Sequence, residues 1–324
     1  MAAVTYLEAI RQGIWEEMER DSRVFVLGED VGLYGGAFKV TEGMLERFGE
    51  DRVVDTPISE SAIVGAAIGA ALMGMRPIAE MQFADFISCA FDQITNFAAK
   101  CRYRWGAGVP LVIRGPSGGG IHGGPYHSQN PEMHYVHTPG LKVVAPSTVY
   151  DAKGLIKAAI RDEDPVIYFE HKFLYRRLKE ELPEGDWTVP IGKADIKRAG
   201  TDISVITYGA MVHLALEAAA TLTNDGIELE VVDLRTLVPL DKECILDSVK
   251  KTNKVILLHE DVRTGGMAGE LAAIIAEEAF EYLDGPIMRI TAPDTPVPYS
   301  PPLEEFFLPK TSDIIRVARQ LAAY

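Results

Sequence analysis

Glu60 is the first side chain in this sequence whose setting suggests proton chemistry. It follows the segment DTPIS at 55–59 and opens an apolar stretch expected to be helical, with Ser59 as the expected N-cap. One interpretation is a carboxylate that simply complements the positive end of a helix. The other is a partly buried carboxyl with a raised pKa, able to hold and pass a proton. The residues alone leave both interpretations open.

Histidines gather in one stretch, residues 115–140, which is rich in glycine and proline and shows no periodicity. It contains His122, His127, His134 and His137. A zinc site would need an HExxH motif or a nearby cysteine, and neither is present. A long irregular stretch inside a compact domain is usually functional. We therefore expect it to supply one or two histidines that handle protons.

Two familiar motifs in the same stretch are set aside. Residues 118–123 match the GxGxxG spacing of a dinucleotide site, and residues 115–119 match the GxSxG spacing around a nucleophilic Ser117. Both motifs require a helix directly afterwards. Gly123-Gly124-Pro125 cannot begin a regular helix, so we expect neither function. A serine hydrolase remains the rival enzyme class to test.

The charge balance limits the partners of this protein. The chain has 324 residues, with 32 Lys and Arg against 47 Asp and Glu, a net charge of −15. This argues against binding nucleic acid or an anionic membrane, because both need a basic face. The apolar run 62–75 is too short to span a bilayer and is interpreted as a buried helix. The glycines of the helix expected at 60–74 predict that a neighbouring backbone approaches it closely. Three cysteines without CxxC spacing and an acidic N-terminal segment lead us to expect a soluble cytoplasmic protein.

Strand and helix patterns alternate along the whole chain. This alternation predicts an α/β protein of two domains with largely parallel sheets. Apolar residues from Phe83 to Cys101 recur at helical spacing and predict one long helix. A polar stretch with prolines and glycines, 171–200, marks the boundary. The predicted domains are 1–185 and 201–324, joined by a linker at 186–200.

Seven separated segments together resemble the β subunits of the thiamine-diphosphate-dependent decarboxylating component of 2-oxo-acid dehydrogenase complexes. They are GED at 28–30, DTPISE at 55–60, RPIAEMQFADF at 76–86, FDQITNFAAKCRYR at 91–104, HSQNPE at 127–132, PGLKVVAPST at 139–148 and DLRTLVPLD at 233–241. The resemblance runs nearly end to end. It implies a transketolase-like architecture, in which a pyrimidine-binding domain precedes a transketolase C-terminal-like domain.

The resemblance also implies roles for individual residues. Glu60 would be catalytic, hydrogen-bonding N1′ of the cofactor's aminopyrimidine, and His127 would face the substrate and the incoming lipoyl group. Phe83 would contact the substrate. The remaining cofactor contacts implied are Glu29, Ile58, Ser59, Gln82 and Phe86. The family often has Tyr where this chain has Phe86, so any role of a hydroxyl is absent here. From spacing alone, Phe86 is interpreted as a packing residue.

Partners follow from the same resemblance. The family's α subunits hold the diphosphate and its magnesium through a GDG motif, which this chain lacks. The resemblance therefore implies an α2β2 heterotetramer that is active only when assembled, and a dihydrolipoyl acyltransferase core with its lipoyl domain. The acidic C-terminal domain is a candidate surface for docking a basic domain of that core. Some members bind potassium, for which Asp162 and Asp164 are candidate ligands.

The substrate expected is a branched-chain 2-oxo acid such as 3-methyl-2-oxobutanoate. QFADF at 82–86, HEDVRTGGMAGE at 259–270 and PDTPVPYSPP at 293–302 resemble the branched-chain enzymes. IGKADIKR at 191–198 resembles bacterial pyruvate dehydrogenase β subunits, which makes pyruvate the alternative and acetoin the third. From a different class, the alternative is a catalytically silent subunit that only tethers a complex.

Overall fold

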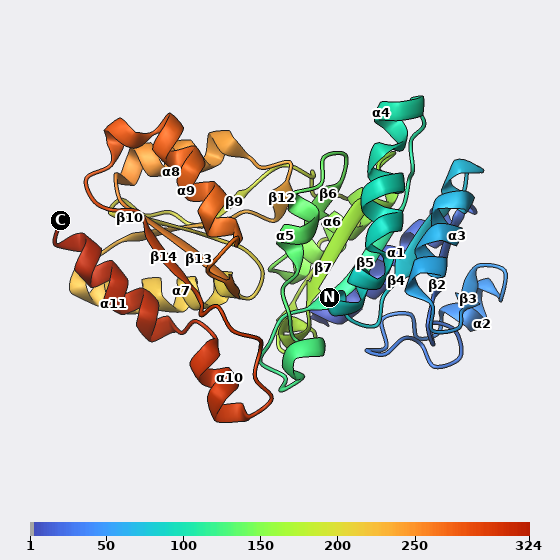
Figure 1. The fold of residues 1–324 in the computed structure, drawn as a ribbon. Coiled ribbons are helices and arrows are strands. Elements are labelled where there is room, and N and C mark those ends of the chain that lie inside the picture. The colour runs from blue at the N-terminus through green and yellow to red at the C-terminus, as the bar shows by residue number, and fades with distance from the viewer. Residues whose placement is uncertain (1–2) are drawn as a thin grey trace. The chain divides into compact units, whose positions relative to one another are not determined.

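The computed structural model describes residues 3–324, which divide into two units that are described separately (Figure 1). Unit 1 contains the residues up to Ser117 together with His134–Ile191. Unit 2 contains Gly118–Met133 and Gly192–Tyr324. The division after Ile191 falls inside the predicted linker. The grouping of residues 118–133 with unit 2 was not predicted, because the sequence shows no boundary on either side of them.

Unit 1 is built on a parallel sheet. Its own strands lie in the order β6-β7-β5-β4-β2-β3, and each neighbouring pair is parallel. The bounds are β2 Val24–Gly28, β3 Val53–Asp55, β4 Arg76–Glu80, β5 Val112–Ser117, β6 Lys142–Val144 and β7 Val166–His171. β4, β5 and β7 are buried at every position, as strands covered on both faces should be. The parallel α/β expectation is confirmed.

Helices cover this sheet. Their bounds are α1 Tyr6–Arg20, α2 Met44–Phe48, α3 Glu60–Leu72, α4 Cys101–Trp105 and α6 Val149–Arg161, while the division between the units falls within α5 Glu132–Val136. α1 begins with a capping box between Thr5 and Glu8, and it packs closely on α6. A Cβ added at Gly13 would lie 2.5 Å from Cγ2 of Ile156, so the glycine allows this approach. The small strands β1 (Val4–Thr5) and β8 (Lys179–Glu180) pair antiparallel.

Two local expectations are corrected. The stretch predicted as one helix from Phe83 to Cys101 is instead a series of short turns, η1 Ala84–Ala90, η2 Gln93–Phe97 and η3 Ala98–Lys100, before α4. The apolar residues still recur at helical spacing. The backbone hydrogen bonds, however, follow the 3₁₀ pattern in η1 and η3 and the π pattern in η2. The second correction concerns the glycines of the helix at 60–74, where a neighbouring backbone was expected to approach closely. Gly69 has no contact within 4 Å for an added Cβ, and Gly74 ends the helix with a positive φ.

Unit 2 contains a second sheet, in the order β14-β13-β10-β11-β9. The strands are β9 Asp195–Arg198, β10 Ile203–Thr207, β11 Leu229–Asp233, β13 Val255–Val262 and β14 Met288–Ala292, and only β9 among them runs antiparallel to its neighbour. The chain runs from β10 outward to β11, then crosses to β13 on the other side. β10 and β13 therefore flank the point where the strand order reverses.

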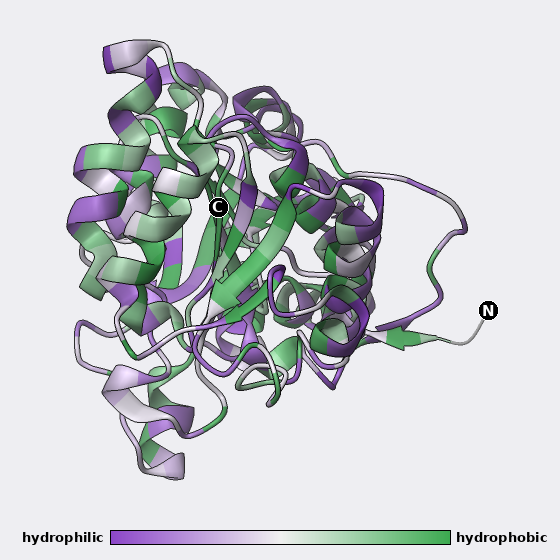
Figure 2. Ribbon diagram, turned by 90° about the vertical axis from the view of Figure 1, so that its right-hand side faces the viewer, coloured by the Kyte–Doolittle hydropathy of each residue, from purple (hydrophilic) through white to green (hydrophobic). Residues whose placement is uncertain are grey.

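The remaining elements of the chain are helical, apart from the short strand β12 (Thr236–Val238). The helices of unit 2 are α7 Met211–Leu222, α8 Lys242–Thr252, α9 Met267–Glu278, α10 Pro301–Phe307 and α11 Thr311–Ala322. Single turns lie at η4 Gly124–Tyr126, η5 Lys172–Leu174, η6 Thr223–Asp225 and η7 Phe280–Tyr282. Figure 2 shows the hydrophobic colour concentrated on the strands and mixed colours on the helices around them. None of the helices described is long and apolar enough to cross a bilayer.

A buried ion triad joins the three central strands of unit 1. Arg114 on β5 contacts Glu80 on β4, and its Nε and Nη2 donate to Glu170 on β7 at 2.5 and 2.9 Å. Arg114 is 1% exposed and Glu170 is fully buried. Burial raises the pKa of Glu80, although Arg114 partly offsets this. Tyr175 donates its hydroxyl hydrogen to Glu170 at 2.7 Å, so both oxygens of that carboxylate have a partner.

Replacing Arg114 with Met should lower the free energy of unfolding by about 3–5 kcal/mol, because two carboxylates would stay buried without their cation. Denaturant unfolding of the chain, followed by circular dichroism, measures this loss. Arg102→Met is the control, since Arg102 pairs with Asp164 at the surface and such pairs contribute about 0–1 kcal/mol. Equal losses in the two variants would contradict the structural role of the triad.

Candidate functional site

Polar side chains of unit 1 gather where three neighbouring parallel strands end. Glu29 directly follows β2, Gln82 follows β4, and Glu60 follows β3 as the first residue of α3. Because β3, β2 and β4 are adjacent and parallel, their carboxyl ends lie along one edge of the sheet. Ligands of open α/β sheets bind at such edges.

Glu29 and Glu60 are close enough to influence each other. Glu29 is 7% exposed, whereas Glu60 is half-buried in the single chain. Burial is the main reason that the pKa of Glu29 is raised, and the charges of Glu60 and Asp30 raise it further. A hydrogen bond from the backbone N–H of Ser59 acts in the opposite direction. The site therefore holds a pair of carboxyls, one of which favours its protonated form more than an exposed glutamate does.

Ser59 occupies the N-cap position of α3, but its side chain makes no capping hydrogen bond. The expectation that Ser59 caps the helix is therefore right in position and wrong in mechanism. The first turn of α3 instead contains the Glu60 carboxylate, which the helix dipole favours there. Ile58 precedes it and is 83% exposed, so an apolar side chain stands at the open side of this edge.

Gln82 and two aromatic rings complete the edge. The Gln82 Nε2 donates to Asp30 Oδ2 at 3.3 Å, which links the ends of β4 and β2. The Phe83 ring meets the Phe86 ring edge to face, with centroids 5.8 Å apart. Phe38 contacts Phe83 in the same way at 5.5 Å. Carboxyl and amide groups beside aromatic rings suit a flat heterocycle, because such a ring has hydrogen-bonding edges and apolar faces.

Sequence reasoning missed Asp30 and Phe38 at this edge. Asp30 belongs to the GED segment that drew attention to Glu29, and its positive φ of 57° marks a turn built for the site. Phe38 lies in the loop between β2 and α2, where no periodicity in the sequence could indicate which way the ring points.

His127 belongs to unit 2 and not to unit 1. It lies directly after η4, is half-buried, and is part of the segment that groups with the C-terminal residues. Its role toward substrate stays a prediction. His134 and His137 belong to unit 1. The histidine-rich stretch is thus divided between the units.

Ser117 of the GxSxG motif and the candidate potassium ligands Asp162 and Asp164 are all described by the structure. Ser117 is 2% exposed and is the last residue of β5, and no helix begins directly after it, so it is not on a strand-to-helix turn. Among residues 3–324, no group of three or more His, Cys, Asp or Glu side chains is arranged to hold a metal ion. Asp162 accepts from Lys142 Nζ at 2.5 Å, and Asp164 accepts from Arg102. The potassium site at these two carboxylates stays a prediction.

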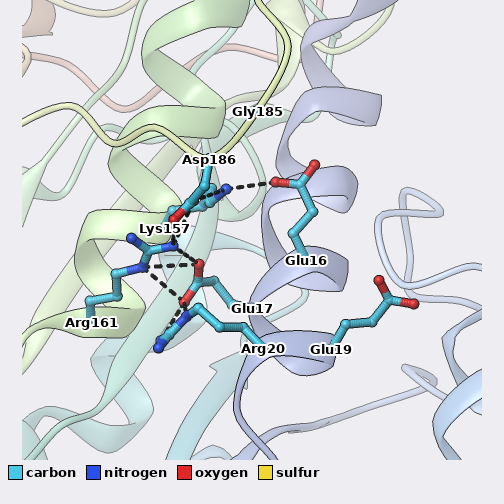
Figure 3. A pocket seen from close by; sticks show the side chains of 8 residues that line it. All are labelled: Glu16, Glu17, Glu19, Arg20, Lys157, Arg161, Gly185 and Asp186. Atoms are coloured by element: carbon cyan, nitrogen blue, oxygen red, sulfur yellow. Dashed lines mark hydrogen bonds and ion pairs between the residues drawn. The ribbon is translucent and has the colours of Figure 1, made fainter.

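A second concave region of unit 1 lies elsewhere, with a volume of about 540 Å³ (Figure 3). Its lining residues are Glu16, Glu17, Glu19, Arg20, Lys157, Arg161, Gly185 and Asp186. Glu17 is fully buried between Arg20 and Arg161, each at 2.6 Å. Lys157 contacts Glu16 and Asp186 at 2.6 and 2.7 Å. Since the buried charges neutralise one another, this cluster ties α1 to α6 and the 185–186 turn and is not a substrate site.

Comparison with known families defines the class of protein. Residues 2–177 match the transketolase pyrimidine-binding domain, and residues 192–314 match the transketolase C-terminal domain. A solved structure titled "Split gene transketolase, inactive beta4 tetramer" shares the fold with a TM-score of 0.80 at 22% identity, covering 99% of this chain and 98% of that chain. The transketolase-like two-domain fold is confirmed.

Curated relatives define the family within that class. The 2-oxoisovalerate dehydrogenase subunit beta of Bacillus subtilis is 56% identical over the full length of both chains. The pyruvate dehydrogenase E1 component subunit beta of the same organism is 46% identical, also over the full length of both. The acetoin:2,6-dichlorophenolindophenol oxidoreductase subunit beta of Cupriavidus necator is 49% identical over 96% of this chain and 95% of its own. This chain belongs to the family of β subunits of thiamine-diphosphate-dependent 2-oxo-acid dehydrogenases.

Unit 2 also contains buried polar groups where β10 and β13 end. His259 is 1% exposed, and no side chain among the described residues forms a hydrogen bond with either ring nitrogen. Its ring lies against Gly266, where an added Cβ would be 2.6 Å from Cε1. Burial lowers the pKa of His259 to about 4. Burial also raises the pKa of the neighbouring Asp261 to about 6. At neutral pH His259 is therefore uncharged, and Asp261 takes up a proton at a higher pH than an exposed aspartate does.

These two groups should make stability depend on pH in opposite directions. The pKa of His259 falls from 6.5 to about 4 on folding, so its contribution is present above pH 6.5 and is lost as pH falls toward 4. We expect His259→Gln to remove an acid-induced loss of about 3 kcal/mol in the free energy of unfolding between these pH values.

Asp261 stabilises the fold most below pH 3.8, and this contribution is lost as pH rises through 6. Asp261→Asn should therefore remove that loss of stability. Denaturant unfolding at several pH values measures both, and parallel pH profiles for wild type and His259→Gln would contradict the first.

Proposed function

We propose that this chain is the β subunit of a branched-chain 2-oxo-acid dehydrogenase. With an α subunit it would decarboxylate acids such as 3-methyl-2-oxobutanoate oxidatively and transfer the acyl group to a lipoyl group of an acyltransferase core. The observation that carries the proposal is the full-length identity of 56% to a 2-oxoisovalerate dehydrogenase β subunit, against 46% to a pyruvate dehydrogenase β subunit.

The residues at the carboxyl edge of unit 1 fit the aminopyrimidine of thiamine diphosphate. That ring needs a carboxyl at N1′, a neutral hydrogen-bonding group and apolar cover on its faces. Glu60, Gln82 and the Phe86 ring are groups of these three kinds. The exposed Ile58 offers a further apolar contact at the open side of the site.

Bound thiamine diphosphate supplies a carbon nucleophile and an electron sink for the decarboxylation. The task of Glu60 is to hydrogen-bond N1′ and hold a proton there. Glu29 assists because burial and the nearby charge of Glu60 raise its pKa, so that the pair holds a shared proton more readily than two exposed glutamates would. Gln82 and Phe86 orient the ring. His127 would steady the substrate carboxylate or give a proton to a lipoyl sulfur during acyl transfer.

An α subunit would complete the site by holding the diphosphate and magnesium, for which this sequence has no GDG segment. An exposed apolar face on α3 supports such a partner. Leu72 is 44% exposed and the following Met73 is 86% exposed. Ala62, Ala66 and Gly69 of the same helix are also exposed. Small and apolar residues on one helix face allow close packing of another chain, and we propose the arrangement α2β2.

Glu60→Gln should lower kcat of the assembled enzyme by about 10²–10⁴-fold, because the amide cannot exchange a proton with N1′. The assay combines this chain with its α partner, thiamine diphosphate and magnesium, and uses an artificial electron acceptor. Glu46→Gln is the matched control, since Glu46 also lies in the first turn of a helix but is exposed. A purely structural carboxylate, or a catalytically silent subunit, predicts equal activity of both variants in an assembled tetramer.

The substrate is tested in the same assay with 3-methyl-2-oxobutanoate and pyruvate. We expect kcat/KM to be at least about tenfold higher for the branched acid, because an extra methylene in an apolar pocket is worth about 1–3 kcal/mol. A preference for pyruvate would move the protein to the pyruvate complexes and keep the proposed site. Turnover of neither acid by a tetramer shown to contain the cofactor would contradict the proposed function.

A further inference from the structure

We propose that two buried glutamates of unit 2, Glu304 and Glu260, are positioning residues for His127. They act on the segment 118–133, named here the histidine loop, by binding its backbone and side chains. The inference rests on the proposed function, because that function gives His127 its task. The inference also gives a role to His122, to which the sequence analysis assigned none.

Glu304 binds one part of the histidine loop. It lies on α10, is 1% exposed, and its Oε1 accepts from the backbone N–H of Gly120 at 3.0 Å. Its Oε2 accepts from the backbone N–H of His122 at 3.1 Å. The same oxygen lies 2.6 Å from Nδ1 of the His122 ring. One carboxylate therefore receives three donors from two residues of the loop, Gly120 and His122.

Glu260 joins the two ends of the loop. It lies on β13, and its Oε1 accepts from the backbone N–H of Gly119 at 2.6 Å and from Asn130 Nδ2 at 3.0 Å. A backbone hydrogen bond from Gly118 to Gln129, 3.1 Å long, closes the loop at the same place. His127 lies between these attachments. Its position is therefore limited on one side by residues 118–122 and on the other by residues 129–130.

Two glycines permit the loop to lie this close to the C-terminal residues. A Cβ on Gly119 would be 3.2 Å from Leu308 and 3.3 Å from Glu304 Oε1. A Cβ on Gly124 would be 2.3 Å from the Tyr299 ring. α10 itself is fixed by Phe307, which packs in a buried cluster with Ala292 and Val297. The histidine loop therefore lies on a well-packed surface formed by residues of the C-terminal segment.

The energetics favour a single position of the loop. A carboxylate removed from water is costly unless hydrogen bonds replace its hydration. The donors that bind the Glu304 carboxylate come from the loop, so lifting the loop would leave a buried charge without those bonds. Loop and carboxylates therefore stabilise each other. A displacement of about 1 Å in a reacting group can cost about 100-fold in rate, which makes this anchoring relevant to turnover.

The first test measures the anchor itself. In Glu304→Ala, amide hydrogen exchange of residues 119–122 in the full chain should become at least about tenfold faster. Glu304→Gln should have a smaller effect, because one oxygen remains to accept the backbone N–H groups. Glu305→Gln is the control, since Glu305 is exposed and pairs only with Lys310 at the surface. Near-ultraviolet circular dichroism shows whether each variant is folded. Unchanged exchange in a folded Glu304→Ala would overturn the inference.

The second test asks whether the anchor acts through His127. In the reconstituted enzyme, Glu304→Ala should lower kcat by about 10–100-fold and leave the affinity for thiamine diphosphate unchanged. In a His127→Asn background the same substitution should change kcat less than about threefold. A full additional loss in that background would assign Glu304 a general structural role and refute positioning. If wild-type enzyme turns over no 2-oxo acid, the proposed function fails, while the exchange result still decides the anchor.

Discussion

A buried arginine between two buried glutamates is the interaction on which unit 1 depends. Arg114 lies within β5 and joins it to β4 through Glu80 and to β7 through Glu170. Burying three charges is costly unless each is paired and hydrogen-bonded, so the register of the three strands is fixed by the need to keep them together. β4 carries Glu80 at its last residue and ends at the sheet edge where the residues proposed for the cofactor lie. The triad therefore supports part of the backbone from which those residues project.

The chain divides its chemistry between two units. Glu29, Glu60, Gln82 and the phenylalanines belong to the pyrimidine-binding unit, whereas His127 belongs to the C-terminal unit. This division follows from carboxylates far along the chain, Glu260 and Glu304, which bind the loop that carries His127. Within the C-terminal unit, these buried glutamates hold the histidine loop and so limit the position of His127.

Much of the architecture could be predicted because it depends on local patterns. Alternating β-branched strands and amphipathic helices such as Thr5–Arg20 gave the α/β class, and the capping box at Thr5 and Glu8 explains why that helix begins where it does. The expected helix from Phe83 to Cys101 was wrong in its hydrogen bonding. An apolar repeat reports which residues face the core, and it does not distinguish an α-helix from successive 3₁₀ and π turns that keep the same face buried.

The sequence by itself determined the family and the order of the two domains, because these depend on short motifs and local periodicity. It also led to the proposal of Glu29, Glu60 and Gln82 as site residues, through the resemblance of those motifs to the family. Only the tertiary structure decided which groups lie together. It placed Asp30 and Phe38 at the cofactor edge, paired Arg114 with its two glutamates, and joined His122 to Glu304 across more than half of the chain. Such contacts depend on long-range packing and on the cost of burying an unpaired charge, and neither leaves a pattern in neighbouring residues.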